Sequence, residues 1–430
     1  MVRKDILFIL ITALGTLIIC SSTGCSGKSS GKSDNRVTIW AHQGQEEEVK
    51  AIQTIIDSFN VSNPGITAEL KTIPSGDKHS YEDKVNAASI ADQLPDVLDL
   101  DGPFVARYAW ANILQPLDRW FTEDELADFL PSIINQGTYN DALYALGAFE
   151  SSVCLYYNAD LFEQEGIAVP KSIDDAWDWE TFASVARTLT VPGKRRGVSF
   201  KMDYGPGEWF TYGFTPLLWS AGEDILSPDR QSCTNYLNSK KSVEVLTAFR
   251  KLFIDSIATA SPAPDVFETG GAAMEWNGHW VLRTYEKIDD FTVGVMPLPR
   301  TGEKQKTPCG SWCWGITRNC KNIDNAVAVL KWITGAKTGV IPMVRANGAP
   351  PARHSVYKEL PEYSNYPRQL FYEQLQKSAQ PRPAVPFYPV LSAEFSRMLA
   401  DITLGADVQK SLENAAQAID LEINRGRYYK

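Results

Sequence analysis

The sequence contains little of what metalloenzymes, serine hydrolases and nucleic-acid-binding proteins use at their sites. Only 4 of its 430 residues are histidines, and no G-x-S-x-G motif occurs beyond residue 35. A metal site or a serine triad therefore has few residues from which to form. The net charge is −10 and no cluster of basic residues is present, which weighs against nucleic acid as a partner. We predict no metal, no cofactor and no catalysis.

The cysteines also lack the paired C-x2-C spacing of a zinc site. Five of them lie beyond residue 25: Cys154, Cys233, Cys309, Cys313 and Cys320. In an exported chain, an odd number leaves at least one free thiol if all disulfides are internal. The spacing leaves open a local disulfide among the last three.

An apolar run occupies the N-terminus of the chain. Arg3 and Lys4 precede the stretch from residue 6 to residue 19, which is too short for a membrane span and is followed by small residues. This pattern is typical of a secretory signal, and residues 22–25 resemble a lipoprotein cleavage box. We predict a signal peptide over residues 1–24, lipidation of Cys25, and a flexible tether over residues 25–35.

The chain is long enough for two compact lobes. Apolar patterns predict strands at 37–40, 66–72 and 95–100, with helices at 46–59 and 81–91 between them. This order predicts a mostly parallel α/β sheet flanked by helices, which binds ligands beyond the carboxyl ends of its strands. The polar residues found there are His42, Gln43, Gln45, Asp99 and Asp101. For Asp101 a helix N-cap is an equal alternative.

Aromatic residues are abundant, with 12 Trp and 17 Tyr. The stretch 270–280, GGAAMEWNGHW, predicts a short strand of small residues that presents Trp280 at its end. An indole in that place can close over a ligand, although Trp276 and Trp280 could equally be core residues on one helical face. Alternation should send Trp312 and Trp314 to one face of a later strand. We treat Trp276, Trp280 and Trp312 as candidate ligand contacts.

Two carboxylates occur among aromatic residues. Glu150 lies in the apolar stretch 143–158, where it must pair with an arginine or accept hydrogen bonds from a ligand. Glu208 and Trp209 belong to a second aromatic stretch, GPGEWFTYGFTPLLW. Two further candidate contacts are Arg353, at the end of a rigid loop, and Tyr388, in a Pro-rich segment that we predict to cross between the lobes.

Several short motifs follow one another along the chain: VTIW at 37–40, Pro95-Asp96, YYNAD at 156–160, GGAAM...GHW at 270–280, DFTVGVMPLP at 290–299 and GAPPAR at 348–353. Their order and spacing resemble the extracellular solute-binding proteins of bacterial ABC importers, in the large family that includes maltose-binding protein. The resemblance runs from Val37 to the C-terminus.

The resemblance implies a type II periplasmic-binding-protein fold, in which a hinge joins two α/β lobes, each a mostly parallel sheet flanked by helices, and the sugar lies in the cleft between them. The N-terminal lobe would comprise residues 34–150 and 312–380, and the C-terminal lobe residues 151–311 and 381–430. Trp280 matches the family's cleft tryptophan and Glu150 a sugar-binding carboxylate. Trp209 and Phe210 match an aromatic pair that stacks on sugar rings. The lysine and aspartate that follow the first strand in the maltose-binding member are absent.

We therefore expect a lipid-anchored monomer on the extracytoplasmic face of the bacterial cell membrane, which captures a neutral sugar or oligosaccharide for an ABC permease. Pyranose rings offer apolar C–H faces to Trp and Tyr, and hydroxyls to Asp, Glu, Gln and Arg. Three alternatives stay open. They are a glycoside hydrolase that uses Glu150 and Glu208 as paired carboxylates, a binding protein for a polyamine or a sugar phosphate, and a surface adhesin.

Overall fold

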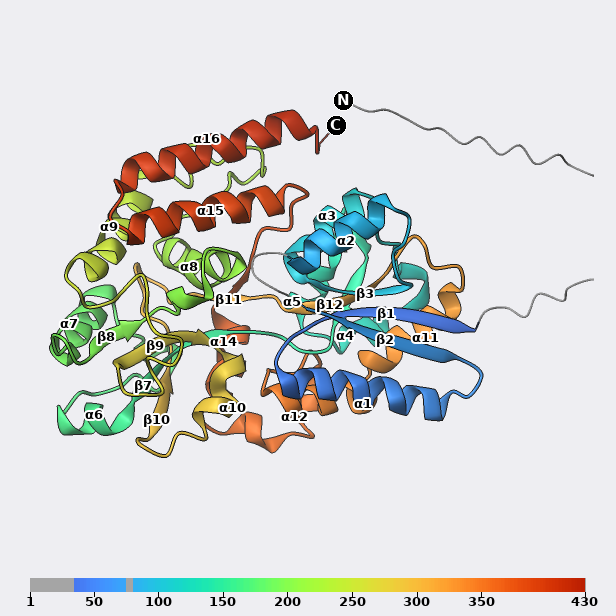
Figure 1. The fold of residues 1–430 in the computed structure, drawn as a ribbon, viewed down its shortest axis with the longest axis horizontal. Helices are drawn as coiled ribbons and strands as arrows, with labels where there is room; N and C mark the ends of the chain where they lie inside the picture. The colour runs from blue at the N-terminus through green and yellow to red at the C-terminus, as the bar shows by residue number, and fades with distance from the viewer. Residues whose placement is uncertain (1–34, 75–79, 430) are drawn as a thin grey trace, which may run out of the picture. The chain divides into compact units, whose positions relative to one another are not determined.

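A computed structural model describes residues 35–74 and 80–429, which belong to one compact unit (Figure 1). The predicted signal peptide, the lipidation site Cys25 and most of the tether lie outside the described residues. The described part has a two-lobe α/β fold with two main β-sheets, each flanked by helices.

The first sheet has five strands in the order β2-β1-β3-β12-β6. The first three strands are parallel to one another, as the alternation of strands and helices along the sequence predicts, whereas β12 runs antiparallel to both β3 and β6. The bounds are β1 (Arg36–His42), β2 (Thr67–Ile73), β3 (Val97–Asp101), β6 (Ala145–Gly147) and β12 (Trp312–Ile316).

Helix α1 (Glu46–Ser62) follows β1 almost directly and packs its apolar stripe on this sheet. The stripe repeats every three to four residues, and its members Ile52, Ile55, Ile56 and Phe59 are all buried. This packing of α1 holds the first sheet in place, and with it the carboxyl ends of β1 and β3, where the polar residues lie.

The second sheet has four strands in the order β10-β7-β9-β8, and its strands are β7 (Val153–Asn158), β8 (Arg196–Ser199), β9 (Ala272–Gly278) and β10 (Val293–Met296). Only the β8–β9 pair is parallel, and β7 runs antiparallel to both of its neighbours. The prediction of a mostly parallel sheet in each lobe was therefore wrong for this one. A buried apolar run shows that a strand is covered on both faces but does not encode its direction.

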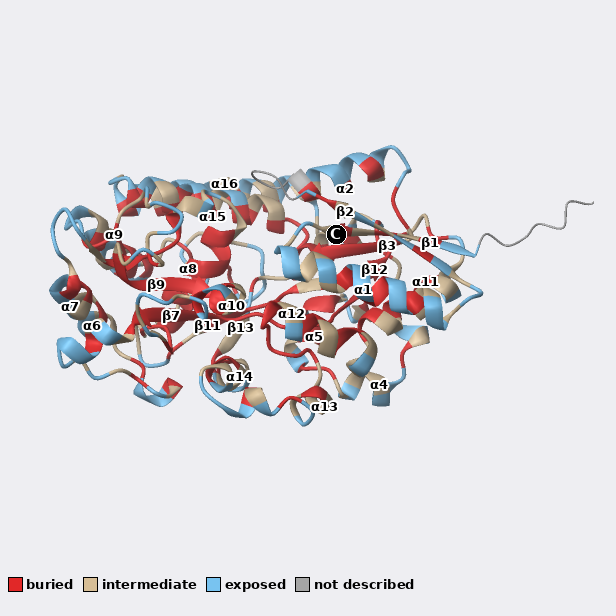
Figure 2. Cartoon of the chain, turned by 60° about the horizontal axis from the view of Figure 1, so that its bottom comes forward, coloured by how far each residue is buried: buried red, intermediate tan, exposed pale blue. Residues whose placement is uncertain are grey.

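The central helix of the second half is α8 (Glu208–Ser220), which is buried from Trp209 to Ser220 (Figure 2). Helices α9 (Lys240–Ile254) and α15 (Tyr388–Thr403) pack against it, α16 (Val408–Gly426) packs on those two helices, and α7 (Trp179–Leu189) packs on β8 and β9. The remaining helices are α2 (Ser80–Ile90), α3 (Val105–Trp110), α4 (Glu123–Ala127), α5 (Pro131–Gly137), α6 (Ala159–Gln164), α10 (Leu282–Tyr285), α11 (Ile323–Ile333), α12 (Ile341–Asn347), α13 (His354–Tyr357) and α14 (Arg368–Lys377).

The chain passes between the two sheets more than once. It leaves the first sheet after β6 and enters the second at β7, and it returns between β10 and β12. A short strand, β11 (Thr307–Cys309), lies on the second of these passages, and it pairs in parallel with β13 (Ala379–Pro381), which lies on a later passage of the chain. A separate small hairpin is formed by β4 (Thr138–Tyr139) and β5 (Ala142–Leu143).

Helix α14 does not pack with the half of the molecule to which the predicted lobe division assigns it. It lies inside the segment 312–380 that we assigned to the N-terminal lobe, yet Leu370 and Phe371 share a buried cluster with Tyr156 and Val295 of the second sheet. Gln374 also donates a hydrogen bond to the Val153 carbonyl. The return of the chain to the second half therefore begins before residue 368. No composition change marks that point in the sequence.

The five cysteines of the described residues are all buried and free, so the local disulfide that the spacing left open is not formed. Within the same residues, no single helix is long and apolar enough to cross a membrane. One pair of consecutive segments, 323–333 and 336–347, meets the length and composition requirement together, but it is bent by 61°.

Candidate ligand-binding cavity

A cavity of about 330 Å³ lies where the edges of the two sheets meet. Six of the predicted contact residues line it: Gln45, Asp101, Glu208, Trp209, Trp280 and Trp312. Ten further residues complete the lining: Gly44, Glu48, Phe149, Ser151, Tyr204, Tyr212, His279, Gly310, Ser311 and Arg382. The cavity therefore combines aromatic rings with carboxylates from both halves of the chain.

The first half contributes residues at the edge of its sheet. Asp101 is the last residue of β3, and Trp312, the first residue of β12, is its register partner. Gln45 precedes α1, at the carboxyl end of β1. Because parallel strands β1 and β3 end at the same edge, their following residues meet there, as the sequence predicts.

Trp280 comes from the second half, directly beyond the end of β9. Its ring packs edge-on against Trp209, with centroids 5.7 Å apart, and lies at 6.1 Å from the ring of Tyr212. Its indole N–H donates to the Tyr204 hydroxyl at 3.4 Å. These three rings hold the half-buried indole of Trp280 in place, so that it is oriented before a ligand arrives.

Trp276 and Phe210 were predicted as contacts but are core residues. Trp276 is 1% exposed and its indole N–H donates to the Gly213 carbonyl at 2.9 Å. Phe210 is 2% exposed and packs on Phe214. In α8 each residue turns by about 100° from the one before it, so Trp209 faces the cavity and Phe210 faces the core.

The polar floor of the cavity is organised by Arg382, which no sequence pattern identified. Its guanidinium donates two hydrogen bonds to Asp101, at 2.8 and 2.9 Å, and one to Glu208, at 2.5 Å. A further bond of 3.3 Å reaches the Gly310 carbonyl. Since the side chain of Arg382 is only 3% exposed, this is a buried ion network that joins β3, α8 and the crossing segment.

The carboxylate of Glu208 is held by additional donors. The hydroxyls of Tyr388 and Ser392 both donate to it, the latter at 2.6 Å. Burial raises the pKa of Glu208, although Arg382 acts in the opposite direction. Tyr388 is therefore a support for Glu208 and does not line the cavity itself, because it is fully buried behind it. Asp101 occupies the N-cap position of the short helical turn Gly102–Phe104, as the alternative predicted, but its side chain makes no capping hydrogen bond.

His42 and Asp99 lie beneath Trp312 and outside the cavity lining. The His42 ring stacks on the Trp312 ring with centroids 3.5 Å apart and planes at 8°, and its Nδ1 lies 2.5 Å from Asp99. Burial acts to lower the pKa of His42, but the charge and hydrogen bond of Asp99 outweigh it and raise that pKa. This pair therefore supports Trp312 from behind, and neither of the two predicted contact residues lines the cavity.

Three other predicted contacts also lie outside the cavity. Glu150 is fully buried and accepts hydrogen bonds from the backbone N–H groups of Ser151 and Gly310, at 2.8 and 2.7 Å, which ties two passages of the chain together. Arg353 stacks on Phe129 and donates to Asp128 and to the Thr334 carbonyl. Gln43 is exposed and is not part of the lining. A buried charge in a sequence does not reveal whether its partner is a ligand or the protein.

His279 lines the cavity as a neutral imidazole. Burial lowers its pKa to about 3, and its buried Nδ1 has no hydrogen-bond partner among the described residues. The ring contacts Phe149 and Trp280 edge-on. No cluster of three or more metal-ligating side chains occurs in the part of the chain that the structure describes.

The chain matches the model of the bacterial extracellular solute-binding protein family over residues 54–370. It belongs to this family. Solved structures support the same conclusion about the fold. The solute-binding protein is 20% identical to an ABC substrate-binding protein from Listeria monocytogenes in complex with cycloalternan, with a TM-score of 0.79 over 90% of this chain and 99% of that one.

Two other proteins of known ligand are also similar to this chain. The cyclic alpha-maltosyl-1,6-maltose binding protein from Arthrobacter globiformis is 24% identical, with a TM-score of 0.75 over 91% of this chain and 99% of that chain. A maltotriose-binding protein from Pyrococcus abyssi is 22% identical over 61% of this chain and 53% of its own length. The family acts outside the cytoplasm, and its members are binding proteins for ABC transporters, not enzymes.

Proposed function

We propose that this solute-binding protein captures a short, neutral sugar in the 330 Å³ cavity and delivers it to an ABC permease, while a lipid on Cys25 anchors it to the membrane. The observation that carries the proposal is the combination of Trp280 and Trp312 with the hydrogen-bonding floor of Asp101, Glu208 and Arg382. Aromatic faces suit the C–H surfaces of a pyranose, and fixed carboxylates suit its hydroxyls.

The charges favour a neutral ligand over a sugar phosphate or a polyamine. Arg382 is the one Lys or Arg among the lining residues, and both of its terminal amino groups are already directed to Asp101, Glu208 and Gly310. No further cation is available for a phosphate. The same pairing occupies Asp101 and Glu208, which reduces their attraction for an amine, and burial raises the pKa of Glu48, the third carboxyl group of the lining.

The size of the cavity favours one or two sugar rings. Its volume of about 330 Å³ is at the lower end of the range of roughly 300–1,000 Å³ that small-molecule sites cover. The side chain of Gln45 also donates to the Trp280 carbonyl at 2.7 Å, which connects the two halves across the cavity. A long oligosaccharide would have to break this hydrogen bond.

The geometry gives no support to a glycoside hydrolase. That reaction needs two carboxyl groups on either side of the scissile bond. Glu150 lies outside the cavity lining and its Oε1 accepts two backbone hydrogen bonds, so it cannot act with Glu208 on one ligand.

We further propose that each sheet is the centre of one lobe. Residues 36–147 and 312–363 would form the first lobe, and residues 153–296 with 368–426 the second. The buried clusters support this division, because Tyr363 packs with the first sheet and Leu370 with the second.

The test is ligand binding by the mature protein and its Trp280→Ala variant. A panel of neutral mono- to tetrasaccharides is screened by thermal shift, and the best sugar is titrated by calorimetry. At a hundred times its dissociation constant, a sugar should add about 2.7 kcal/mol of stability. We expect Trp280→Ala to weaken binding about a hundredfold, because a stacked ring that loses water is a typical binding hot spot.

Two other tryptophans serve as controls for this variant. Trp110→Ala removes a ring that is 41% exposed and absent from the cavity lining, so it should keep wild-type affinity. Trp276→Ala removes a core ring and should cost roughly 3–5 kcal/mol of stability. The proposal fails if no sugar in the panel stabilises the protein, or if Trp280→Ala binds the best sugar as tightly as Trp110→Ala does.

A further inference from the structure

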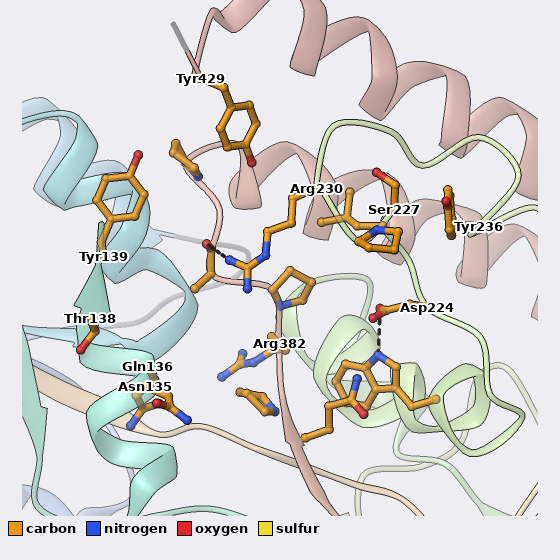
Figure 3. Close-up of a pocket in the computed structure, with 18 of the residues that line it drawn as sticks. Asn135, Gln136, Thr138, Tyr139, Asp224, Ser227, Arg230, Tyr236, Arg382 and Tyr429 are labelled. Carbon is orange, nitrogen blue, oxygen red and sulfur yellow. Dashed lines mark hydrogen bonds between the residues drawn. The ribbon is translucent and has the colours of Figure 1, made fainter. Parts of the chain in front are cut away.

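A second and larger cavity has no role in the proposed function. It measures about 1170 Å³, against 330 Å³ for the ligand-binding cavity, and Arg382 is the one lining residue that the two share (Figure 3). Its walls come from residues 135–141, from the loop 222–236 that follows α8, and from the crossing segment 380–386. We call this cavity the crossing groove.

The crossing groove presents three tyrosine rings on its walls. Figure 3 shows Tyr139 and Tyr429 on one side of Arg230 and Tyr236 on the other. Tyr429 is 46% exposed, and Tyr139 and Tyr236 are partly exposed. Partly exposed rings of this kind offer an apolar face together with a hydroxyl group.

Amide side chains line the crossing groove together with these rings. Among them are Asn135, Asn235 and Gln380, and each carries both a donor and an acceptor. Vicinal hydroxyls of a sugar need this combination, because each hydroxyl both donates and accepts. The smaller cavity likewise combines aromatic rings with polar side chains, although its polar groups include carboxylates.

The basic residues of the crossing groove do not form an anion site. Arg382 and Arg230 are the two basic residues of its lining; the first is bound to Asp101 and Glu208, and the second donates to the Ala384 carbonyl at 3.1 Å. A phosphate therefore finds no free cluster of cations here. The acidic lining residues are Asp141, Glu223 and Asp224, and Asp224 already accepts from the indole N–H of Trp219 at 3.1 Å.

The wall formed by the loop 222–236 is held in place before any ligand binds. Asp420 of α16 accepts hydrogen bonds from the backbone of Cys233 and Thr234, at 2.5 and 3.2 Å. The bond from Arg230 to Ala384 joins this loop to the crossing segment. A site whose walls are already ordered loses less entropy on binding than a mobile one.

We propose that the crossing groove is a second carbohydrate site, which binds a neutral oligosaccharide of several rings. The proposal goes beyond the proposed function and does not depend on it, because its residues, apart from Arg382, are different. The tyrosines stack on successive rings and the amides pair with the hydroxyls. The protein then holds two carbohydrates at once, a short one in the small cavity and a longer one in the crossing groove.

The test uses the Trp280→Ala protein, in which the small cavity is impaired. Neutral tetrasaccharides (maltotetraose, isomaltotetraose, cellotetraose, xylotetraose and mannotetraose) are titrated into it at millimolar concentration by calorimetry. We expect at least one to bind, and the additional pair Tyr139→Ala and Tyr236→Ala to weaken it at least tenfold. The pair Tyr139→Phe and Tyr236→Phe keeps both rings and should retain binding within about threefold.

Two outcomes overturn the proposal: no tetrasaccharide binds the Trp280→Ala protein, or binding is unchanged when both tyrosines become alanine. A third is that the charged control, tetragalacturonate, binds while the neutral sugars do not. The melting temperature of the Tyr139→Ala, Tyr236→Ala protein shows that it is folded. Its affinity for the small-cavity sugar, measured without Trp280→Ala, should stay at the wild-type value, which separates this test from that of the proposed function.

Discussion

Arg382 offers the sharpest test of how the cavity is built, because one side chain holds carboxylates from both halves of the chain. Arg382→Met keeps most of the volume but leaves Asp101 and Glu208 buried without their cation. Breaking a buried ion pair by removing one partner costs about 3–5 kcal/mol, since the remaining charge is not solvated. For a chain of this size, that loss corresponds to a fall in melting temperature of roughly 3–6 °C.

Calorimetry at pH 7 measures this fall, with Arg397→Met as the matched control. Arg397 pairs with Glu394 on the surface, where its side chain is 55% exposed, so its loss should cost less than about 1 kcal/mol. Because burial already raises the pKa of Glu208, acidification to pH 4 should protonate it and shrink the deficit of Arg382→Met. A double variant, Asp101→Asn with Arg382→Met, should recover part of the stability. If Arg382→Met unfolds within 1 °C of Arg397→Met at pH 7, the network does not support the cavity.

Two further predictions concern acid–base behaviour and export. Glu275 of β9 is buried, and burial raises its pKa from 4.5 to about 7. The folded chain therefore keeps this proton while the unfolded chain loses it, so wild-type stability should fall by up to about 3 kcal/mol as the pH rises from 4.5 to 7. Glu275→Gln should remove that slope in denaturant titrations at several pH values; an unchanged slope contradicts the assignment. For export, Cys25→Ser should abolish lipidation and release the protein from membranes, as intact mass and fractionation show, and a variant that stays lipidated refutes it.

Much of the first half could be predicted from the sequence, because its signals are local. The strands β1 to β3 alternate with helices, the first of which has a clear apolar stripe, so their parallel order and the position of Asp101 follow from the order of the patterns along the chain. Trp280 could be placed at a strand end because small residues precede it and Asn277 and Gly278 end the strand.

The rest depends on contacts between residues far apart in the chain. Arg382 lies 281 positions from Asp101, within a Pro-rich segment that carries no periodic signal. Glu150 and Arg353 are residue types that often contact ligands, but their partners here are Gly310 and Asp128. Only the tertiary fold brings these partners near. Helix α14 shows the same limit, since its amphipathic pattern predicts a buried face without saying which sheet will cover it.

The five buried thiols described above allow local unfolding of the protein to be measured without an added label site. They are distributed over separate buried clusters, with Cys320 in one core, Cys154 in another, and Cys233 and Cys313 in the largest. Burial raises the thiol pKa of Cys154, Cys309 and Cys313, so the reactive thiolate is scarce at neutral pH while these residues remain covered. A thiol-reactive dye can therefore label each site only during an excursion that exposes it, and its rate measures how often that core opens. Mass spectrometry of labelled peptides, with and without sugar, then reports whether a ligand slows these excursions in one lobe or in both.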